Sequence, residues 1–234
     1  VIPDTRPDPI RKEPIRLLFF GDVMLGRNVE SLMNKFGEDY PFENIQPLID
    51  EYDFVHANLE GPIEYQHMYT PSDSVNFGFV STTAELLARH GFDAVALGNN
   101  HTLDRGRQTY VDTLEILDAA GVLHSGHSVE MGLEHVLKTD APGIPMIFAS
   151  FNVTFPFSDA DAAVETITQL ETESDDPIIV NIHWGEEYKT HSNAVQQDLA
   201  HRLVDAGADL IIGHHPHVVE ESEEYNGVMI FYSL

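Results

Sequence analysis

Three histidines within four residues follow an apolar run near the end of the chain. The run Ala208–Ile212 is typical of a buried strand, and the sequence Gly-His-His-Pro-His (residues 213–217) comes directly after it. His215 and His217 are two residues apart, so their rings point to the same side of an extended chain. Two imidazoles on one side can hold one transition-metal ion, or one ion each of a pair. Burying three imidazoles without partners is costly, so this segment predicts a metal site.

Four other apolar runs also end on a carboxylate, an amide or an imidazole. The residues that close them are Gly21-Asp22, Asn58-Leu59-Glu60, Asn99-Asn100-His101 and His183. Ligands of open α/β sheets collect at the carboxyl ends of the strands. These strand ends, together with the histidine-rich segment, therefore predict one metal centre at one edge of the fold.

Strand-like and helix-like segments alternate along the chain, which predicts an α/β fold with a mostly parallel sheet. The predicted strands are Ile15–Phe20, Asp53–Ala57, Asp93–Leu97, Pro145–Phe151, Pro177–Ile182 and Asp209–Ile212. The predicted helices are Asn28–Phe36, Thr82–His90, Asp104–Ala120, Ala160–Leu170 and Asn193–Ala206. We expect a long loop over Gly61–Val80 and a terminal hairpin of Val218–Glu220 with Val228–Tyr232. Residues 1–14 form a Pro-rich, charged lead-in, and residues 15–234 form one domain.

Each candidate ligand also has a purely structural interpretation. Asp22 could cap the helix that follows it, and Asn58 and Glu60 could belong to a simple strand-to-turn transition. A lone histidine such as His183 is more often a core residue than a ligand. The Asn99–His101 segment is harder to explain in this way, because the residues after it can cap the next helix unaided.

The composition excludes several classes of function. With 39 acidic and 12 basic residues, the formal net charge of -27 disfavours nucleic acid and anionic membranes, whose binding requires cations on the protein. Such a surface is either simply solvated or adapted to high salt. The absence of cysteine excludes disulfides and thiolate zinc sites. No apolar run reaches the ~20 residues of a membrane helix.

Two common hydrolase and phosphate-binding signatures are missing from the sequence. It contains no Gly-x-Ser-x-Gly nucleophile turn and no Gly-rich phosphate loop. Val23 follows Gly21-Asp22 at the place where a GDSL-type esterase has its serine.

Six ordered motifs, spread from Leu18 to Leu234, resemble the CapA (poly-gamma-glutamate capsule biosynthesis) family, which belongs with the calcineurin-like metallophosphoesterases. The motifs are Gly21–Arg27, Asn58–Glu60, Asn99–Asp104, His183–Tyr188, Gly207–His217 and Tyr232–Leu234. The resemblance implies a metallophosphoesterase-like two-sheet α/β/β/α sandwich. It also implies two divalent-metal positions, for Mn, Fe or Zn.

The resemblance assigns roles to individual residues of this chain. The implied metal ligands are Asp22, Glu60, Asn100, His183, His215 and His217. Glu60 is favoured over Asn58 as the bridging carboxylate, and His101 is the implied general acid. Met24 stands where the superfamily has a histidine ligand, and a thioether is a poor ligand for hard cations, so one of the two metal positions is expected to be weak or absent.

The predicted function is that of a CapA-like capsule or poly-gamma-glutamate biosynthesis protein with a metal-dependent phosphoesterase-type centre. The alternatives are a non-enzymatic scaffold or export subunit for an anionic capsule polymer, and a metal-dependent amide hydrolase that acts on γ-glutamyl polymer. Arg27 and Arg105 are scarce cations beside ligand motifs, so they are candidates to bind an anionic substrate, although surface ion pairs would also account for them. His214 is assigned to substrate binding together with these two arginines.

The resemblance also implies partners and a location. The partners would be an anionic polymer or a phosphoester, and other capsule-synthesis subunits; the location would be extracellular or on the cell surface. The segment between Phe151 and Ala160 is shorter than in relatives, and the chain stops at Tyr232-Ser233-Leu234, where the family continues with Gly-Asn-Phe. We therefore expect a segment of the natural protein to be missing.

Overall fold

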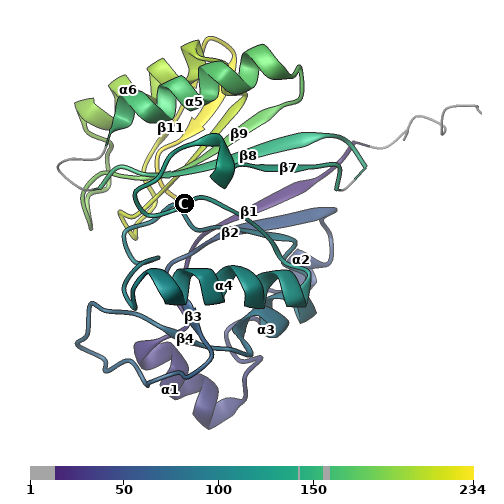
Figure 1. Ribbon diagram of the computed structural model, residues 1–234, viewed down its shortest axis with the longest axis vertical. Coiled ribbons are helices and arrows are strands. Elements are labelled where there is room, and N and C mark those ends of the chain that lie inside the picture. Colours follow the sequence, from purple (N-terminus) through teal and green to yellow (C-terminus); the bar gives the residue numbers. More distant parts are fainter. Residues whose placement is uncertain (1–13, 142, 155–158) are drawn as a thin grey trace, which may run out of the picture.

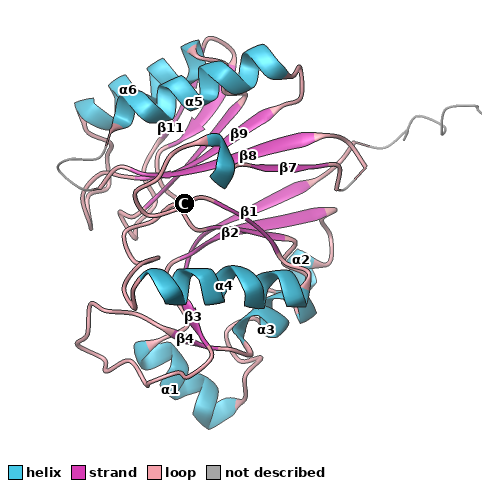
Figure 2. Ribbon diagram, viewed as in Figure 1, coloured by secondary structure: helices cyan, strands magenta, loops and turns pink. Residues whose placement is uncertain are grey.

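Two β-sheets lie face to face, and helices cover the outer face of each (Figure 1). The computed structural model describes residues 14–141, 143–154 and 159–234. The predicted lead-in therefore lies outside the described residues, except for Pro14. The layer order is helices, sheet, sheet, helices, as Figure 2 shows by element type, and the predicted two-sheet α/β/β/α fold is confirmed.

The first sheet consists of four parallel strands in the order β1-β2-β5-β6. Its strands are β1 (Leu17–Val23), β2 (Phe54–Leu59), β5 (Ala94–Ala96) and β6 (Leu123–Ser125). The helices of this half are α1 (Arg27–Phe36), α2 (Gln46–Ile49), α3 (Thr83–Arg89) and α4 (Arg107–Ala120). Alternate strand residues such as Val55 and Val95 pack in one apolar cluster with Leu87 and Leu117 of the helices.

The second sheet has six strands in the order β11-β12-β10-β9-β8-β7. Its strands are β7 (Leu137–Thr139), β8 (Met146–Asn152), β9 (Ile178–His183), β10 (Leu210–His214), β11 (Ser222–Tyr225) and β12 (Val228–Phe231). The four inner strands are parallel, and β7 and β11 pair antiparallel at the two edges. The helices α5 (Ala160–Glu173) and α6 (Ala194–Asp205) cover its outer face (Figure 1).

The inner faces of the two sheets meet through aromatic side chains. Phe54 stacks on Phe148 of the other sheet with 5.3 Å between ring centroids, and His56 stacks on the same ring at 5.3 Å and 5°. His56 is fully buried, and burial lowers its pKa to about 3, so its ring is neutral at physiological pH. Nearer the carboxyl ends of the strands, Ser125 and Ser150 share a hydrogen bond between the sheets. This packing brings the ends of strands from both sheets to one edge.

The predicted strands and helices are present with ends shifted by a few residues, but one strand prediction is wrong. The hairpin turn is Asn226-Gly227, both with positive φ, and such a two-residue turn pairs the residues directly beside it. The partner strand is therefore β11, and Val218–Glu220 belongs to the loop after His217.

Three further details differ from the sequence expectation. The helix predicted from Asp104 begins at Arg107, because Gly106 has a φ of 91° and the Asp104 side chain accepts a hydrogen bond from the amide of Phe77. The predicted loop Gly61–Val80 contains a small parallel pair, β3 (Ile63–Glu64) and β4 (Phe79–Val80). The elements β6, β7, α2 and the 3₁₀ turn Leu133–His135 are too short to show periodicity. No helix among the described residues is long and apolar enough to cross a membrane.

Candidate metal centre

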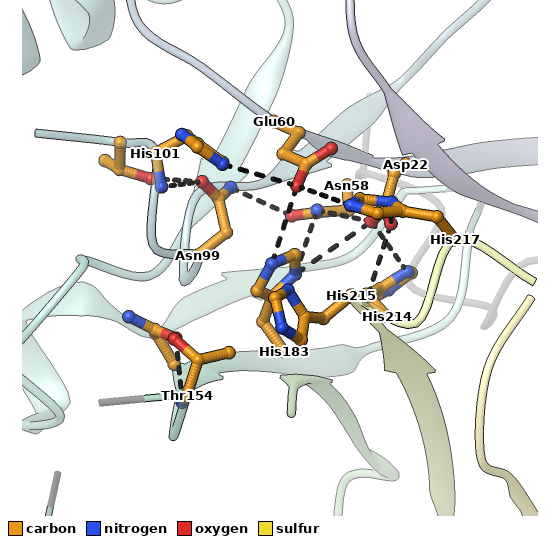
Figure 3. Close-up of polar contacts among 12 residues, drawn as sticks. Asp22, Asn58, Glu60, Asn99, His101, Thr154, His183, His214, His215 and His217 are labelled. Carbon is orange, nitrogen blue, oxygen red and sulfur yellow. Dashed lines mark hydrogen bonds and ion pairs between the residues drawn. The ribbon is translucent and has the colours of Figure 1, made fainter. Parts of the chain in front are cut away.

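Side chains from both sheets converge at the carboxyl ends of the strands (Figure 3). Asp22 comes from β1 and Glu60 follows β2, whereas His183 ends β9 and both His215 and His217 follow β10. One oxygen of Glu60 is central, because Oε1 lies 3.7 Å from Nε2 of His183 and 3.6 Å from Nε2 of His217. The structure thus brings together five of the six predicted metal ligands around one carboxylate.

Two groups of ligand atoms share Glu60. Asp22, Glu60 and His217 form one group, and Glu60, His183 and His215 form the other; within each group the ligand atoms lie within 4.8 Å of one another. A carboxylate common to two such groups has the position of a bridge between two cations, which in two-metal sites lie roughly 3.5–4 Å apart.

Besides the two ring nitrogens of His214, four buried atoms of the predicted ligands have no hydrogen-bond partner among the described residues. They are Oε1 of Glu60, Oδ1 of Asn100, Nε2 of His183 and Nδ1 of His215. Buried polar groups are normally satisfied, and each orphaned one costs roughly 1–3 kcal/mol. These four atoms are a carboxylate, an amide oxygen and two imidazole nitrogens, the donor types that bind divalent transition metals. The residues therefore fit such an ion, and Asn100, the sixth predicted ligand, carries one of the orphaned atoms.

An amide network holds the carboxylate of Asp22 in place. Asn58 donates from Nδ2 to Oδ1 of Asp22 at 2.8 Å, and its own Oδ1 accepts from Nδ2 of Asn99 at 3.0 Å. Asn99 also donates to the carbonyl of Leu59 and accepts from the amide of His101. Because Nδ2 and Oδ1 of Asn99 each have a defined partner, the network determines the orientation of the side-chain amides of both Asn58 and Asn99. Asn58 also lies 3.3 Å from Nδ1 of His183, which links the network to the second sheet.

Backbone strain positions the ligands of the second sheet. His215 and His217 have φ values of 96° and 55°, and Tyr188, beside His217, has 62°. Left-handed backbone is unfavourable for residues with a Cβ, and it persists at functional sites when the surrounding structure imposes it. Three of the five non-glycine residues with positive φ among the described residues thus lie at the centre.

The charge states of three histidines suit metal binding, whereas Glu60 and His217 would each have to lose a proton. Burial lowers the pKa of His183, His214 and His215, which leaves the rings neutral and able to offer a lone pair. Burial raises the pKa of Glu60 to about 8, and the charge of Asp22 adds to this effect. Burial alone would also raise the pKa of Asp22, but the hydrogen bonds with His217 and Asn58 and the nearby His183 and His214 together outweigh burial and hold the pKa well below its usual range. The hydrogen bond with Asp22 raises the pKa of His217.

The predicted general acid, His101, lies at the edge of this centre. Its Nδ1 contacts Oδ2 of Asp104 at 2.7 Å, and its Nε2 lies 3.9 Å from Oε1 of Glu60. The ring of Phe77 packs against the imidazole with 4.0 Å between centroids. An Asp-His pair of this kind fixes which nitrogen of the ring faces the centre.

The three predicted substrate-binding residues lie outside this group of ligands. Arg27 donates from Nε to the carbonyl of Ser72, and its guanidinium lies 5.6 Å from the centroid of the Phe77 ring. Arg105 faces Glu64, with 3.5 Å between Nε and Oε1. The ring of His214 is 1% exposed and lies behind Asp22, at 3.7 Å, so it presents no surface to a substrate in this conformation.

Sequence reasoning assigned no role to three residues that the geometry singles out. Asp104 contacts His101, and its place three residues later in the same motif was the available signal. Asn99 organises the amide network described above. Glu187 joins His215 and His217 in a third group of ligand atoms, and it follows His183 by four residues.

Met24, which stands where the superfamily has a histidine ligand, turns its sulfur toward the amide of Gly26, at 3.2 Å, and packs on the helix-side core.

Comparison with known proteins agrees with this architecture. A family model described as bacterial capsule synthesis protein PGA_cap matches residues 16–234. The chain is 32% identical to the PGA biosynthesis protein CapA of Bacillus subtilis, over 92% of the chain and 61% of that protein. It is 30% identical to the capsule biosynthesis protein CapA of Bacillus anthracis, over 95% of the chain and 59% of that protein. The chain thus spans about three fifths of the length of these relatives.

Among solved structures, a hypothetical protein from Thermus thermophilus shares the fold. The TM-score is 0.60 at 20% identity, covering 94% of this chain and 75% of the other. The match to the family model extends over both sheets and every strand end that carries a candidate ligand. The chain belongs to the bacterial capsule synthesis protein PGA_cap family, within the metallophosphoesterase-like superfamily.

Proposed function

We propose that this chain is a metal-dependent hydrolase that holds two divalent cations and cleaves a phosphoester. The observation that carries the proposal is that the two ligand groups sharing Glu60 contain three buried, unpartnered ligand atoms, with a fourth on Asn100, next to His101 in the chain. A folded core rarely leaves so many polar atoms unsatisfied in one place unless a bound species completes them.

Each cation would have its own ligand set. Asp22, Glu60 and His217 would hold one cation. The second set is formed by the residues with the orphaned atoms: Glu60, Asn100, His183 and His215. This mixture of oxygen and nitrogen ligands suits Mn²⁺, Fe or Zn²⁺. Such a pair, when bound, lowers the pKa of water and polarises the bond under attack.

His101 would protonate the oxygen of the leaving group. Asp104 accepts from Nδ1, which leaves Nε2 directed toward the centre, 3.9 Å from Glu60. Phe77 covers one face of the ring and restricts its rotation. A general acid placed in this way contributes roughly 10²–10⁴-fold to the rate.

The biological substrate would be connected with capsule polymer. The names of the two Bacillus relatives refer to capsule and PGA biosynthesis. We propose an extracellular or cell-surface location, where other capsule-synthesis subunits would be partners. Because poly-gamma-glutamate is an amide polymer, hydrolysis of a γ-glutamyl amide at the same centre is a second candidate.

A scaffold or export role is the non-enzymatic candidate. Met24 favours it, because its sulfur faces Gly26 and the helix-side core and adds no ligand to the Asp22 side of the centre. In that case the metal would be structural.

Metal analysis and a substrate panel test the proposal. Protein purified without chelator should contain two equivalents of cation and hydrolyse phosphomonoesters or phosphodiesters. His101→Ala should keep its metal and lose roughly 10²–10⁴-fold in rate on esters with poor leaving groups. Nitrophenyl esters should lose much less, because nitrophenolate departs without a proton. His124→Ala, which removes a histidine paired with Asp118 away from the centre, is the control.

Two results would contradict the proposal. Loss of metal in His101→Ala, with equal loss on both kinds of ester, would make His101 a ligand. Full metal content without hydrolysis of any phosphoester would leave the amide hydrolase or the scaffold, and a γ-glutamyl polymer assay would separate these two.

A further inference from the structure

The solvent side of the centre is bordered by the turn 185–188, which joins β9 to the segment before α6. Trp184 anchors its start, because the ring is buried and Nε1 donates to the carbonyl of Tyr232 at 2.8 Å. The amide of Tyr188 anchors its end by donating to the carbonyl of Pro216 at 2.8 Å. Gly185 and Tyr188 both have positive φ, at 81° and 62°. The turn is thus held against the loop that carries His215 and His217.

This turn carries a carboxylate to the two histidines. Ligand atoms of Glu187, His215 and His217 lie within 4.8 Å of one another. The Nδ1 atom of His215 is buried and has no hydrogen-bond partner among the described residues. Glu187 itself is exposed, and it forms no hydrogen bond or ion pair with any residue that the structure describes. An unpaired carboxylate therefore stands beside an unpaired imidazole at the mouth of the centre.

We propose that Glu187 is a further ligand of the cation held by Glu60, His183 and His215 and closes the centre on its solvent side. The inference rests on the proposed function, since it requires the cation. A carboxylate supplies a negative charge and an oxygen donor on the flank where the other side chains are neutral or cationic imidazoles. Its exposure suits a ligand that joins after the cation has entered, because the side chain has room to swing toward the metal.

Glu186 provides a matched control for this role. It is the adjacent residue, carries the same charge and is also exposed, but it belongs to none of the ligand groups. Glu186→Gln and Glu187→Gln therefore change the net charge identically, and only the second removes a proposed ligand. Both side chains are at the surface, so neither substitution should prevent folding, which circular dichroism checks.

The experiment is a titration of the chelator-treated chain with Mn²⁺ and with Co²⁺. Calorimetry should show that Glu187→Gln weakens one of the two equivalents by at least about 10–100-fold, the loss typical of even an indirect partner of a metal ligand. Glu187→Asp should retain part of the affinity, and Glu186→Gln should match the wild type. The visible absorption of bound Co²⁺ should change in Glu187→Gln alone, because it reports the coordination sphere rather than the net charge.

Two outcomes overturn the inference without affecting the proposed function. Equal Mn²⁺ affinities and Co²⁺ spectra in the wild type and Glu187→Gln would show that Glu187 is not a ligand. Equal weakening in Glu186→Gln and Glu187→Gln would show a general charge effect. Failure of the wild type to bind either cation would instead overturn the proposed centre itself, and the inference with it.

Discussion

The two halves of the molecule contribute different chemistry to the centre and hold it in different ways. The half built on the first sheet supplies Asp22, Glu60 and Asn100, whose side chains are all candidate oxygen ligands. The half built on the second sheet supplies imidazoles, from His183 to His217. Asp22 is supported by side-chain hydrogen bonds through Asn58 and Asn99, whereas the loop after β10 relies on left-handed backbone.

This difference follows from side-chain chemistry. Carboxylates and amides accept hydrogen bonds as well as metals, so neighbouring amides can orient them before a cation arrives. A neutral imidazole that offers one nitrogen to the metal has only one other nitrogen for a hydrogen bond that could orient the ring. The backbone conformation must therefore contribute more to the position of the ring. Neither half offers a complete ligand set, and the centre exists only where the sheets pack together.

The largest effect is expected from separating the two halves. A Cβ at Gly98 would lie 2.5 Å from the backbone carbonyl of Ser150 on β8, where β8 cannot give way without distorting the second sheet. Gly98→Ala should therefore destabilise the fold by about 3 kcal/mol, at the upper end of overpacking costs, and should weaken cation binding. Urea unfolding measures the first effect. Gly26→Ala, whose new Cβ would meet only ordinary contacts at 3.5–3.6 Å, is the control and should cost far less.

The next effect concerns the cation as the link between the halves. At about a hundred times its dissociation constant, a cation should add roughly 2.7 kcal/mol to the free energy of unfolding. His183→Ala removes an imidazole of the second half and should abolish most of this gain, while the first half keeps its carboxylates. His191→Ala, an exposed histidine in the same connecting segment, should respond to cations like the wild type. An unchanged thermal midpoint with every cation would favour a degenerate site.

A smaller effect is expected from breaking the amide network of the first half. Asn99→Ala leaves Oδ1 of Asn58 without its donor and removes one of the two donors to the carbonyl of Leu59, which keeps the amide of Gly61. This should cost roughly 1–3 kcal/mol, the penalty for orphaned buried polar groups, and should loosen Asp22 through Asn58. Asn76→Ala, which removes a comparable hydrogen bond from an exposed amide to the carbonyl of Asp104, is the comparison. Similar losses in both variants would argue against a special role for the network.

The smallest effect tests strain in the second half. Tyr188 has a φ of 62° and is 71% exposed, so its ring contributes little packing. Tyr188→Gly should relieve the left-handed strain of roughly 1–2 kcal/mol and lose part of that through the entropy of glycine, for a net gain of about 0.5–1 kcal/mol. Tyr188→Ala keeps the strain and should give no gain. A destabilised Tyr188→Gly would show that the ring matters more than the backbone.

The sequence by itself determined the class of fold and the neighbourhood of the centre. Apolar runs with alternating helices dictate parallel strands, and parallel strands place their carboxyl ends together, so Asp22, Glu60 and His183 were expected at one edge. The sequence also determines the position of the hairpin turn, because Asn226 and Gly227 readily adopt the positive φ values of a two-residue turn in any surroundings.

The family resemblance named His215, His217 and Asn100 as ligands, but only the tertiary structure gives the physical reason why these residues, and not their polar neighbours, are available to the centre. His214 continues the strand and faces inward behind Asp22, while the left-handed backbone at His215 and His217 turns those rings into the centre. Asn99 and Asn100 differ in the same way, since one supports the network and the other leaves its oxygen unpaired. The choice depends on φ values imposed by packing between two sheets, and on partners more than a hundred residues away, which no local pattern encodes.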